Sequence, residues 1–319
     1  MQQITCPLCN SSEDTPVADV HDRLLGIEGQ FTMVQCAHCG LYYLNPQPSR
    51  AELVRYYPDN YDPFTTLSPD EMPLLRRLSV NYGLRKRCRV VMRYRQRGTL
   101  LEIGCANGLF LNVIRQMGDW QVQGVDISEQ AVRYAQERFA LDVFCGELQE
   151  AGFPDRSFDV VVMWDVLEHV HDPQGTLLEI CRVLKPDGVF VFRVPLLESW
   201  DRKLFGPYWA GWDAPRHLTF FSLRTLEKML AQTGFTITQT SCISGSYPAF
   251  VLSVRFWARE HLSAPAQVWL RRILESLPVR FVVGPYFYLV DRLLKSAVVT
   301  VIAHLGETDR QSIMTEDVK

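Results

Sequence analysis

Four of the nine cysteines stand in two closely spaced pairs near the start of the chain. Cys6 and Cys9 form one C-x-x-C pair, and Cys36 and Cys39 form the other. Four thiolates in this arrangement suit tetrahedral Zn²⁺, and a site closed by four cysteines leaves no open position for a reactant. Neither pair lies at the strand-to-helix turn of a thioredoxin-like redox motif. We therefore predict a structural zinc ribbon over residues 1–48.

A glycine-containing turn follows an apolar run at residues 100–108, with the sequence L-L-E-I-G-C-A-N-G. Gly104 and Gly108 allow a tight turn and close approach of a ligand to the backbone beside Cys105. Asp126 ends the next apolar run, where a carboxylate can accept both hydroxyls of a ribose. The glycine spacing is not that of a dinucleotide site, and Glu102 would repel a pyrophosphate but attract an ammonium group. These features favour S-adenosylmethionine, which carries an ammonium group and no phosphate.

Further residues at the ends of apolar runs are candidates for the same cofactor site. Ile127 follows Asp126, and Trp164 ends the apolar run at 158–164. Glu147 and Leu148 follow the run at 141–145, and Glu147 is placed to accept a hydrogen bond from an adenine amino group. We expect all of them to contact or border the cofactor.

From residue 98 onward, apolar runs alternate with amphipathic segments, which predicts βαβ units around a parallel sheet. The expected strands are 99–103, 121–126, 141–145, 158–164, 189–194, 235–243 and 297–303. The expected helices are 108–117, 128–140, 174–184 and 222–233. The predicted division is a helical linker, a main domain with two substrate-shaping insertions, and a tail: 49–97, 98–305 with insertions 195–221 and 244–296, and 306–319.

Residues 98–195 resemble class I methyltransferases, especially the ubiquinone-biosynthesis O-methyltransferases. The shared motifs are the E-x-G-x-x-x-G turn, the acid after the second strand, S-F-D at 157–159, L-E-H-V at 167–170 and R-V-L-K-P-D-G at 182–188. The resemblance implies an α/β fold with a Rossmann-like seven-stranded sheet. It also implies that the glycine turn and the acids named above form the cofactor site, with Trp164 near the sulfonium.

The N-terminal region is similar to the head of zinc-ribbon sugar C-methyltransferases over residues 6–61, including L-N-P-Q-P at 44–48. The segment P-R-H-L-T-F-F-S at 215–222 resembles the E-H-L-x-Y-F-S segment of those enzymes, whose histidine is the proposed base. This resemblance implies that His217 is a general base, with His169 of the L-E-H-V motif as a second catalytic candidate. Either histidine could instead have only a structural role. Arg216 replaces the glutamate of the sugar enzymes, and its guanidinium suits a carboxylate or phosphate on the substrate.

Composition limits the remaining classes of function. The formal net charge is −3, which argues against a nucleic-acid partner. Nine basic residues and no acid lie between residues 74 and 97, which indicates a solvated helix face or a docking site for phosphate or a membrane surface. No secretory signal or spanning apolar segment is evident, so we expect a cytoplasmic protein, with peripheral contact at the inner membrane face as an open alternative.

These observations predict an enzyme that methylates an oxygen or carbon atom of a small metabolite, sugar or lipid-linked acceptor. The alternative is a non-enzymatic module that keeps the fold for cofactor binding or partner docking. The sequence leaves the acceptor and the oligomeric state open.

Overall fold

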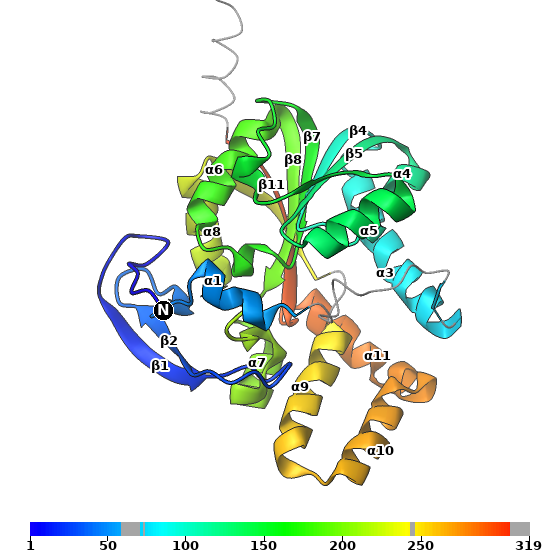
Figure 1. The fold of residues 1–319 in the computed structure, drawn as a ribbon. Coiled ribbons are helices and arrows are strands. Elements are labelled where there is room, and N and C mark those ends of the chain that lie inside the picture. Colours follow the sequence, from blue (N-terminus) through cyan, green and yellow to red (C-terminus); the bar gives the residue numbers. More distant parts are fainter. Residues whose placement is uncertain (59–70, 73, 243–245, 307–319) are drawn as a thin grey trace, which may run out of the picture.

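A computed structural model describes residues 1–58, 71–72, 74–242 and 246–306 of the chain, and its centre is a seven-stranded sheet (Figure 1). The strand order is β10-β11-β8-β7-β4-β5-β6. Five neighbouring strands run parallel: β4 (Arg97–Ile103), β5 (Asp119–Asp126), β6 (Asp142–Cys145), β7 (Phe158–Trp164) and β8 (Leu184–Pro195). β11 (Val298–Leu305) is antiparallel to both of its neighbours, β8 and β10 (Phe235–Ser241). The Rossmann-like seven-stranded sheet expected from the sequence is confirmed.

The central strands are apolar on both faces because helices cover both sides of the sheet. α6 (Pro173–Val183) and α8 (Leu223–Gln232) pack on one face. α4 (Leu109–Met117), α5 (Glu129–Phe139) and α3 (Leu74–Met92) pack on the other. Ser128 and Ser222 cap α5 and α8 with their side chains, as short polar residues do at helix starts.

The N-terminal region forms a second, antiparallel sheet of four strands. β1 (Asp14–Val20), β2 (Phe31–Cys36) and β3 (Tyr42–Leu44) come from the ribbon. The fourth strand, β9 (Thr219–Phe220), comes from the 195–221 insertion and pairs with β3. The ribbon and the insertion therefore share one sheet.

The segment between ribbon and main domain contains α1 (Arg50–Leu53), the 3-10 turn η1 (Val54–Tyr56) and α3. Residues 59–70 and 73 of the predicted linker, and the predicted tail from 307 on, lie outside the described residues. On α3, Leu84, Cys88 and Val91 are buried against the sheet domain, and most of the basic side chains are exposed.

The two insertions are largely helical. The first contains α7 (Trp200–Phe205) and the turns η5 (Gly206–Tyr208) and η6 (Ala210–Trp212). The second contains α9 (Ser246–His261), α10 (Ala264–Glu275) and α11 (Leu277–Arg292), which project away from the central sheet (Figure 1). Among the described helices, none combines the length and apolar character needed to cross a bilayer.

Candidate functional site

The glycine turn lies where β4 ends and α4 begins, at the carboxyl edge of the parallel strands. Gly104 and Gly108 adopt positive φ angles of 69° and 73°. A Cβ atom on Gly104 would lie 2.4 Å from Cγ2 of Val166, and one on Gly108 would lie 2.5 Å from Cδ1 of Leu141. Both conformation and space therefore require glycine at these positions.

Two acids flank this turn, and both are buried. Glu102 is 3% exposed, and its Oε2 has no hydrogen-bond partner in the described part of the chain. Burial raises the pKa of Glu102 well above its usual value, against the opposing effect of nearby Arg87. Asp126 accepts hydrogen bonds from the Ala106 amide (2.7 Å) and the Ser128 amide (2.9 Å), so its carboxylate is fixed beside the turn. A buried carboxyl group with one unpartnered oxygen beside a glycine turn fits a cofactor that carries an ammonium group.

The other predicted cofactor residues differ in how they can contribute. Ile127 is 63% exposed, so its side chain can contact a ligand directly. Leu148 is buried in the hydrophobic core on one face of the sheet, and Cys105 is buried in the core on the other face. The Glu147 carboxylate forms an ion pair with Arg50 at 2.7 Å.

Trp164 ends β7 and lies between an aromatic ring and a cation. Its ring packs edge-on against Phe110 with 5.6 Å between centroids, and the Arg87 guanidinium lies 5.3 Å from the Trp164 ring centre. Arg87 is also 3.9 Å from Asp165, which accepts a 2.7 Å hydrogen bond from Nε of Arg193.

The roles of Arg87 and Arg193 at this position are not evident from the sequence. Arg87 was grouped with the basic face of the 74–97 segment, and Arg193 was not singled out. The available signal for Arg87 was its position directly before Cys88, on the stripe of α3 that faces the sheet.

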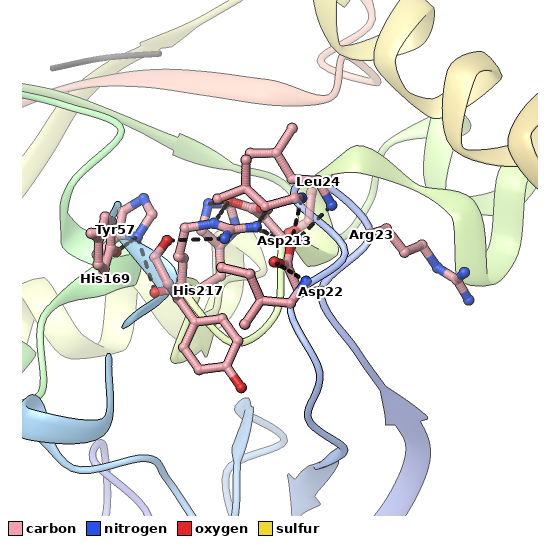
Figure 2. Close-up of polar contacts among 12 residues, drawn as sticks. Asp22, Arg23, Leu24, Tyr57, His169, Asp213 and His217 are labelled. Atoms are coloured by element: carbon pink, nitrogen blue, oxygen red, sulfur yellow. Dashed lines mark hydrogen bonds and ion pairs between the residues drawn. The ribbon is translucent and has the colours of Figure 1, made fainter. Parts of the chain in front are cut away.

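The two histidines predicted to be catalytic come together although they are far apart in sequence (Figure 2). His169 lies in the 3-10 turn η4 (Leu167–His169) after β7, and His217 lies in the first insertion. Their ring centroids are 4.5 Å apart. Burial lowers the pKa of His169 to about 3 and also lowers the pKa of His217, so both imidazoles are neutral at pH 7.

Backbone carbonyls fix the orientation of both imidazoles. Nδ1 of His217 lies 2.9 Å from the Gly211 carbonyl oxygen. Nδ1 of His169 lies 3.0 Å from the Arg216 carbonyl oxygen and 2.9 Å from the Tyr57 hydroxyl. Since a carbonyl oxygen can only accept, both Nδ1 atoms carry the proton, and both Nε2 atoms hold a lone pair.

Glu168 lies close to both histidines and is 1% exposed. Neither of its carboxylate oxygens has a hydrogen-bond partner among the described residues. Nε2 of His217 is 3.9 Å from Oε1 of Glu168, and burial raises the pKa of Glu168 well above its usual value. From the L-E-H-V motif alone, Glu168 is expected only to fix the turn after β7.

The expectation that Arg216 serves the substrate is wrong. Its side chain is fully buried and donates to Asp22 Oδ1 and Asp213 Oδ1, both at 2.6 Å, and to the Tyr56 carbonyl oxygen at 3.2 Å. Asp22 is buried and Asp213 is partly buried, so the two carboxylates need a cation, and Arg216 supplies it. The labelled acids Asp22 and Asp213 in Figure 2 come from the ribbon and the insertion, so this arginine ties the two together.

The histidine pair and the glycine turn are neighbours in space. Val166, two residues before Glu168, occupies the space next to Gly104 that a Cβ atom would fill. The amide of Leu218, next to His217, donates to the Glu168 carbonyl oxygen at 2.7 Å. The glycine turn and the histidines therefore lie at one edge of the sheet.

The four predicted zinc ligands also come together. Sγ of Cys6 is 3.5 Å from Sγ of Cys39, Sγ of Cys9 is 3.5 Å from Sγ of Cys36, and all four sulfurs lie within 4.8 Å of one another. A tetrahedral zinc with bonds of about 2.3 Å would place its sulfurs roughly 3.8 Å apart. This geometry fits zinc.

The two cysteine pairs have the same turn after them. Asn10 and Gly40 have positive φ angles, 58° and 78°. Their amides donate to the carbonyl oxygens of Cys6 and Cys36 at 2.9 and 3.0 Å. The backbone therefore holds each pair in a matching knuckle.

Comparison with known proteins adds a family to this geometry. A family model described as a methyltransferase domain matches residues 80–240. The chain is 31% identical over 190 residues to a probable S-adenosylmethionine-dependent methyltransferase of Mycolicibacterium smegmatis, covering 57% of this chain and 70% of that protein. It is 26% identical to a ubiquinone biosynthesis O-methyltransferase of Parvibaculum lavamentivorans, covering 58% of this chain and 76% of the relative.

Among solved structures, a geranyl diphosphate C-methyltransferase from Streptomyces coelicolor matches with a TM-score of 0.47 and 14% identity. The match covers 69% of this chain and 80% of that one.

Proposed function

Since the chain belongs to the methyltransferase domain family and is an S-adenosylmethionine-dependent methyltransferase, we propose that it methylates an oxygen or carbon atom of a small metabolite, a sugar or a lipid-linked acceptor. The observation that carries this proposal is the position of Val166, which lies beside Gly104 and whose carbonyl oxygen accepts a hydrogen bond from the His169 amide at 2.9 Å, because it places the glycine turn next to the histidine pair. Family membership also argues against the non-enzymatic module that the sequence left open.

In this proposal the chain's own residues bind each part of the cofactor. Asp126 accepts hydrogen bonds from the ribose hydroxyls, and Glu102 balances the ammonium group through its unpartnered Oε2. Ile127 packs on the adenine, and Glu147 accepts from the adenine amino group after exchanging its contact with Arg50. The bound cofactor supplies an electrophilic methyl group on a sulfonium near Trp164.

Methylation of a hydroxyl or a carbon acid also requires loss of a proton from the acceptor. We place this step at the histidine pair, with His217 as the first candidate and His169 as the second. Each offers a neutral Nε2 lone pair, because its Nδ1 proton is donated to a backbone carbonyl oxygen. The acceptor then lies between these nitrogens and the sulfonium, so that proximity and proton removal act together.

The names of relatives suggest candidate acceptors. A demethylmenaquinone methyltransferase of Lactobacillus johnsonii is 27% identical, over 56% of this chain and 84% of that protein. Together with the ubiquinone O-methyltransferase, it favours a ring hydroxyl or ring carbon of a quinone-like compound as the first acceptor to test. Sugar and lipid-linked acceptors remain in the screen.

We further propose that Cys6, Cys9, Cys36 and Cys39 bind one structural zinc. Four sulfurs within 4.8 Å of one another support this, and the ribbon's small sheet has little core of its own. The metal would hold the ribbon against the first insertion through β3 and β9.

Peripheral contact with a membrane at its cytoplasmic face is also part of the proposal. Helices α10 and α11 expose large apolar side chains. Among them are Trp269, Phe281 and Val282, which are 67%, 81% and 80% exposed. Arg271 and Arg272 are also exposed, on α10. Apolar side chains beside cations suit the interface of an anionic bilayer, where a quinone-like or lipid-linked acceptor would be found.

Calorimetry with S-adenosylhomocysteine and turnover of S-adenosylmethionine over an acceptor pool test the proposal. We expect His217→Ala to bind S-adenosylhomocysteine normally and to lose on the order of 10²- to 10⁴-fold in rate. His171→Gln, two residues after His169 but outside the histidine pair, is the control. A His217→Ala variant that melts at a lower temperature but keeps its turnover would assign this histidine to packing.

A further inference from the structure

A cavity of about 220 Å³ lies where the ribbon, the first insertion and α9 meet. The ribbon contributes Val17 and Met33 to its walls. The insertion contributes Trp209 and Trp212, and α9 contributes Phe256. A cavity of about 150 Å³ lined by apolar side chains is large enough for a benzene ring, so this one has room for a ring or a short hydrocarbon chain.

One buried polar group of the cavity wall lacks a partner. Trp209 is 1% exposed, and its Nε1 has no hydrogen-bond acceptor among the described residues. Other side chains of the wall already have polar partners: Asp19, Arg23, Arg202, Trp212 and Asp213. Because a buried N–H without an acceptor is costly, a ligand that places an oxygen atom at Trp209 would be stabilised there.

The cavity borders the histidine pair through the turn η6. Asp213 lines the cavity, and its Oδ2 is 3.9 Å from Nε2 of His217. The Gly211 carbonyl oxygen lies 2.9 Å from Nδ1 of the same histidine. Gly211 also lies against the Trp209 indole, since a Cβ atom on it would be 2.3 Å from Cζ2 of that ring. A ligand in the cavity would therefore lie next to the segment that orients His217.

The walls of this cavity belong partly to regions outside the shared methyltransferase domain. Val17 and Met33 precede the matched range 80–240, and Phe256 follows it. The helix α9 that carries Phe256 also packs on α11, where the rings of Phe250 and Phe287 are 5.4 Å apart. The cavity is thus continuous with the helices that we expect to contact a membrane, which favours a ligand of lipid character.

We propose that this cavity binds the hydrocarbon chain of the acceptor, and that Trp209 donates to an ether, ester or hydroxyl oxygen on that chain. This inference rests on the proposed methyl transfer and specifies its acceptor as amphipathic. The polar group that receives the methyl lies at the histidines, and the apolar chain lies between the ribbon and α9. The ribbon would then select the acceptor as well as support the main domain.

Calorimetry with simple alcohols tests the cavity without any turnover. We expect saturable binding of hexan-1-ol with a negative heat-capacity change, and an affinity that rises about 4-fold for each CH₂ added from butan-1-ol. Ala18→Trp, at an exposed position of β1 that lines the cavity, should weaken hexan-1-ol at least about 10-fold by filling the space of two or more CH₂ groups. Thr15→Trp, on the same strand but outside the cavity wall, is the matched control.

The indole N–H is tested separately with Trp209→Phe, which keeps an aromatic ring and removes the donor. We expect this variant to bind hexan-1-ol about 2- to 12-fold more weakly and to bind hexane as the wild type does. Equal affinity for hexan-1-ol in Trp209→Phe and wild type would overturn the role of Trp209.

Two hydroquinone ethers test whether the chain belongs to the acceptor. With S-adenosylhomocysteine bound, 4-(hexyloxy)phenol should bind at least about 10-fold more tightly than 4-methoxyphenol, and Ala18→Trp should remove this difference. His217→Gln should weaken 4-(hexyloxy)phenol but not hexan-1-ol, which also shows that this variant is folded. Unchanged binding of both compounds to His217→Gln would overturn the assignment to the acceptor.

A protein that binds S-adenosylhomocysteine normally but not hexan-1-ol would overturn the proposal. Equal binding of hexan-1-ol to Ala18→Trp and Thr15→Trp would also overturn it, since the alcohol would then lie elsewhere. A protein that binds hexan-1-ol as expected but no S-adenosylhomocysteine would instead contradict the proposed methyl transfer.

Discussion

Replacement of Asp126 by alanine tests the cofactor site at its most constrained acid. The carboxylate already accepts from the amides of Ala106 and Ser128, which places it at the end of β5 beside the glycine turn. A methyl group cannot accept the ribose hydroxyls. Hydrogen bonds to a charged group contribute about 1.5–3 kcal/mol, so S-adenosylhomocysteine should bind about 10- to 150-fold more weakly.

The same change removes the acceptor of two backbone amides, so part of the loss could come from a rearranged turn. Asp126→Asn separates the two effects because its amide oxygen keeps one acceptor but no charge. We expect calorimetry to give intermediate affinity for Asp126→Asn and the weakest for Asp126→Ala. Unchanged affinity in a folded Asp126→Ala variant would refute the role of this acid in cofactor binding.

Three further predictions concern the zinc ribbon, the buried Arg216 and the helices α10 and α11. Cys6→Ser should lose the ribbon zinc by elemental analysis and lower the melting temperature; an unchanged metal content would exclude the cysteine site. Arg216→Met should cost about 3–5 kcal/mol in urea unfolding because it leaves buried carboxylates uncompensated, and a cost below about 1 kcal/mol would contradict this account. Trp269→Ser combined with Phe281→Ser should reduce co-sedimentation with anionic vesicles without changing S-adenosylhomocysteine affinity; equal sedimentation would remove these helices from membrane contact.

The strands and helices of the main sheet domain could be predicted because the signals for them lie within short segments of the sequence. Each central strand is a short apolar run, and helices such as α5 and α8 begin at serines that cap them. The cysteine pairs are equally local, since spacing alone specifies two knuckles. Pairing of β9 with β3 was beyond sequence reasoning, because two residues of an insertion carry no periodic signal that identifies a distant partner strand.

The cluster of polar side chains around His169 and His217 was predicted only in part, because its residues are brought together by tertiary packing. His169 and His217 were identified through family resemblance, and nothing in their spacing indicates rings 4.5 Å apart. Arg216 was misjudged because a sequence does not show that Asp22, from another region, is buried beside it. Glu168 was passed over for the same reason, since an unpartnered carboxylate is recognised only once its surroundings are known.

Contacts around His169 and His217 connect these two histidines to the ribbon. Arg216 binds Asp22 of the ribbon through its side chain, and its own carbonyl oxygen accepts from Nδ1 of His169. The Tyr57 hydroxyl, from the segment after the ribbon, contacts the same imidazole nitrogen at 2.9 Å. Loss of the ribbon's order would therefore disturb both contacts that orient His169. A zinc ion bound by four cysteines, with no open coordination position, can in this way still be necessary for the arrangement of His169 and His217.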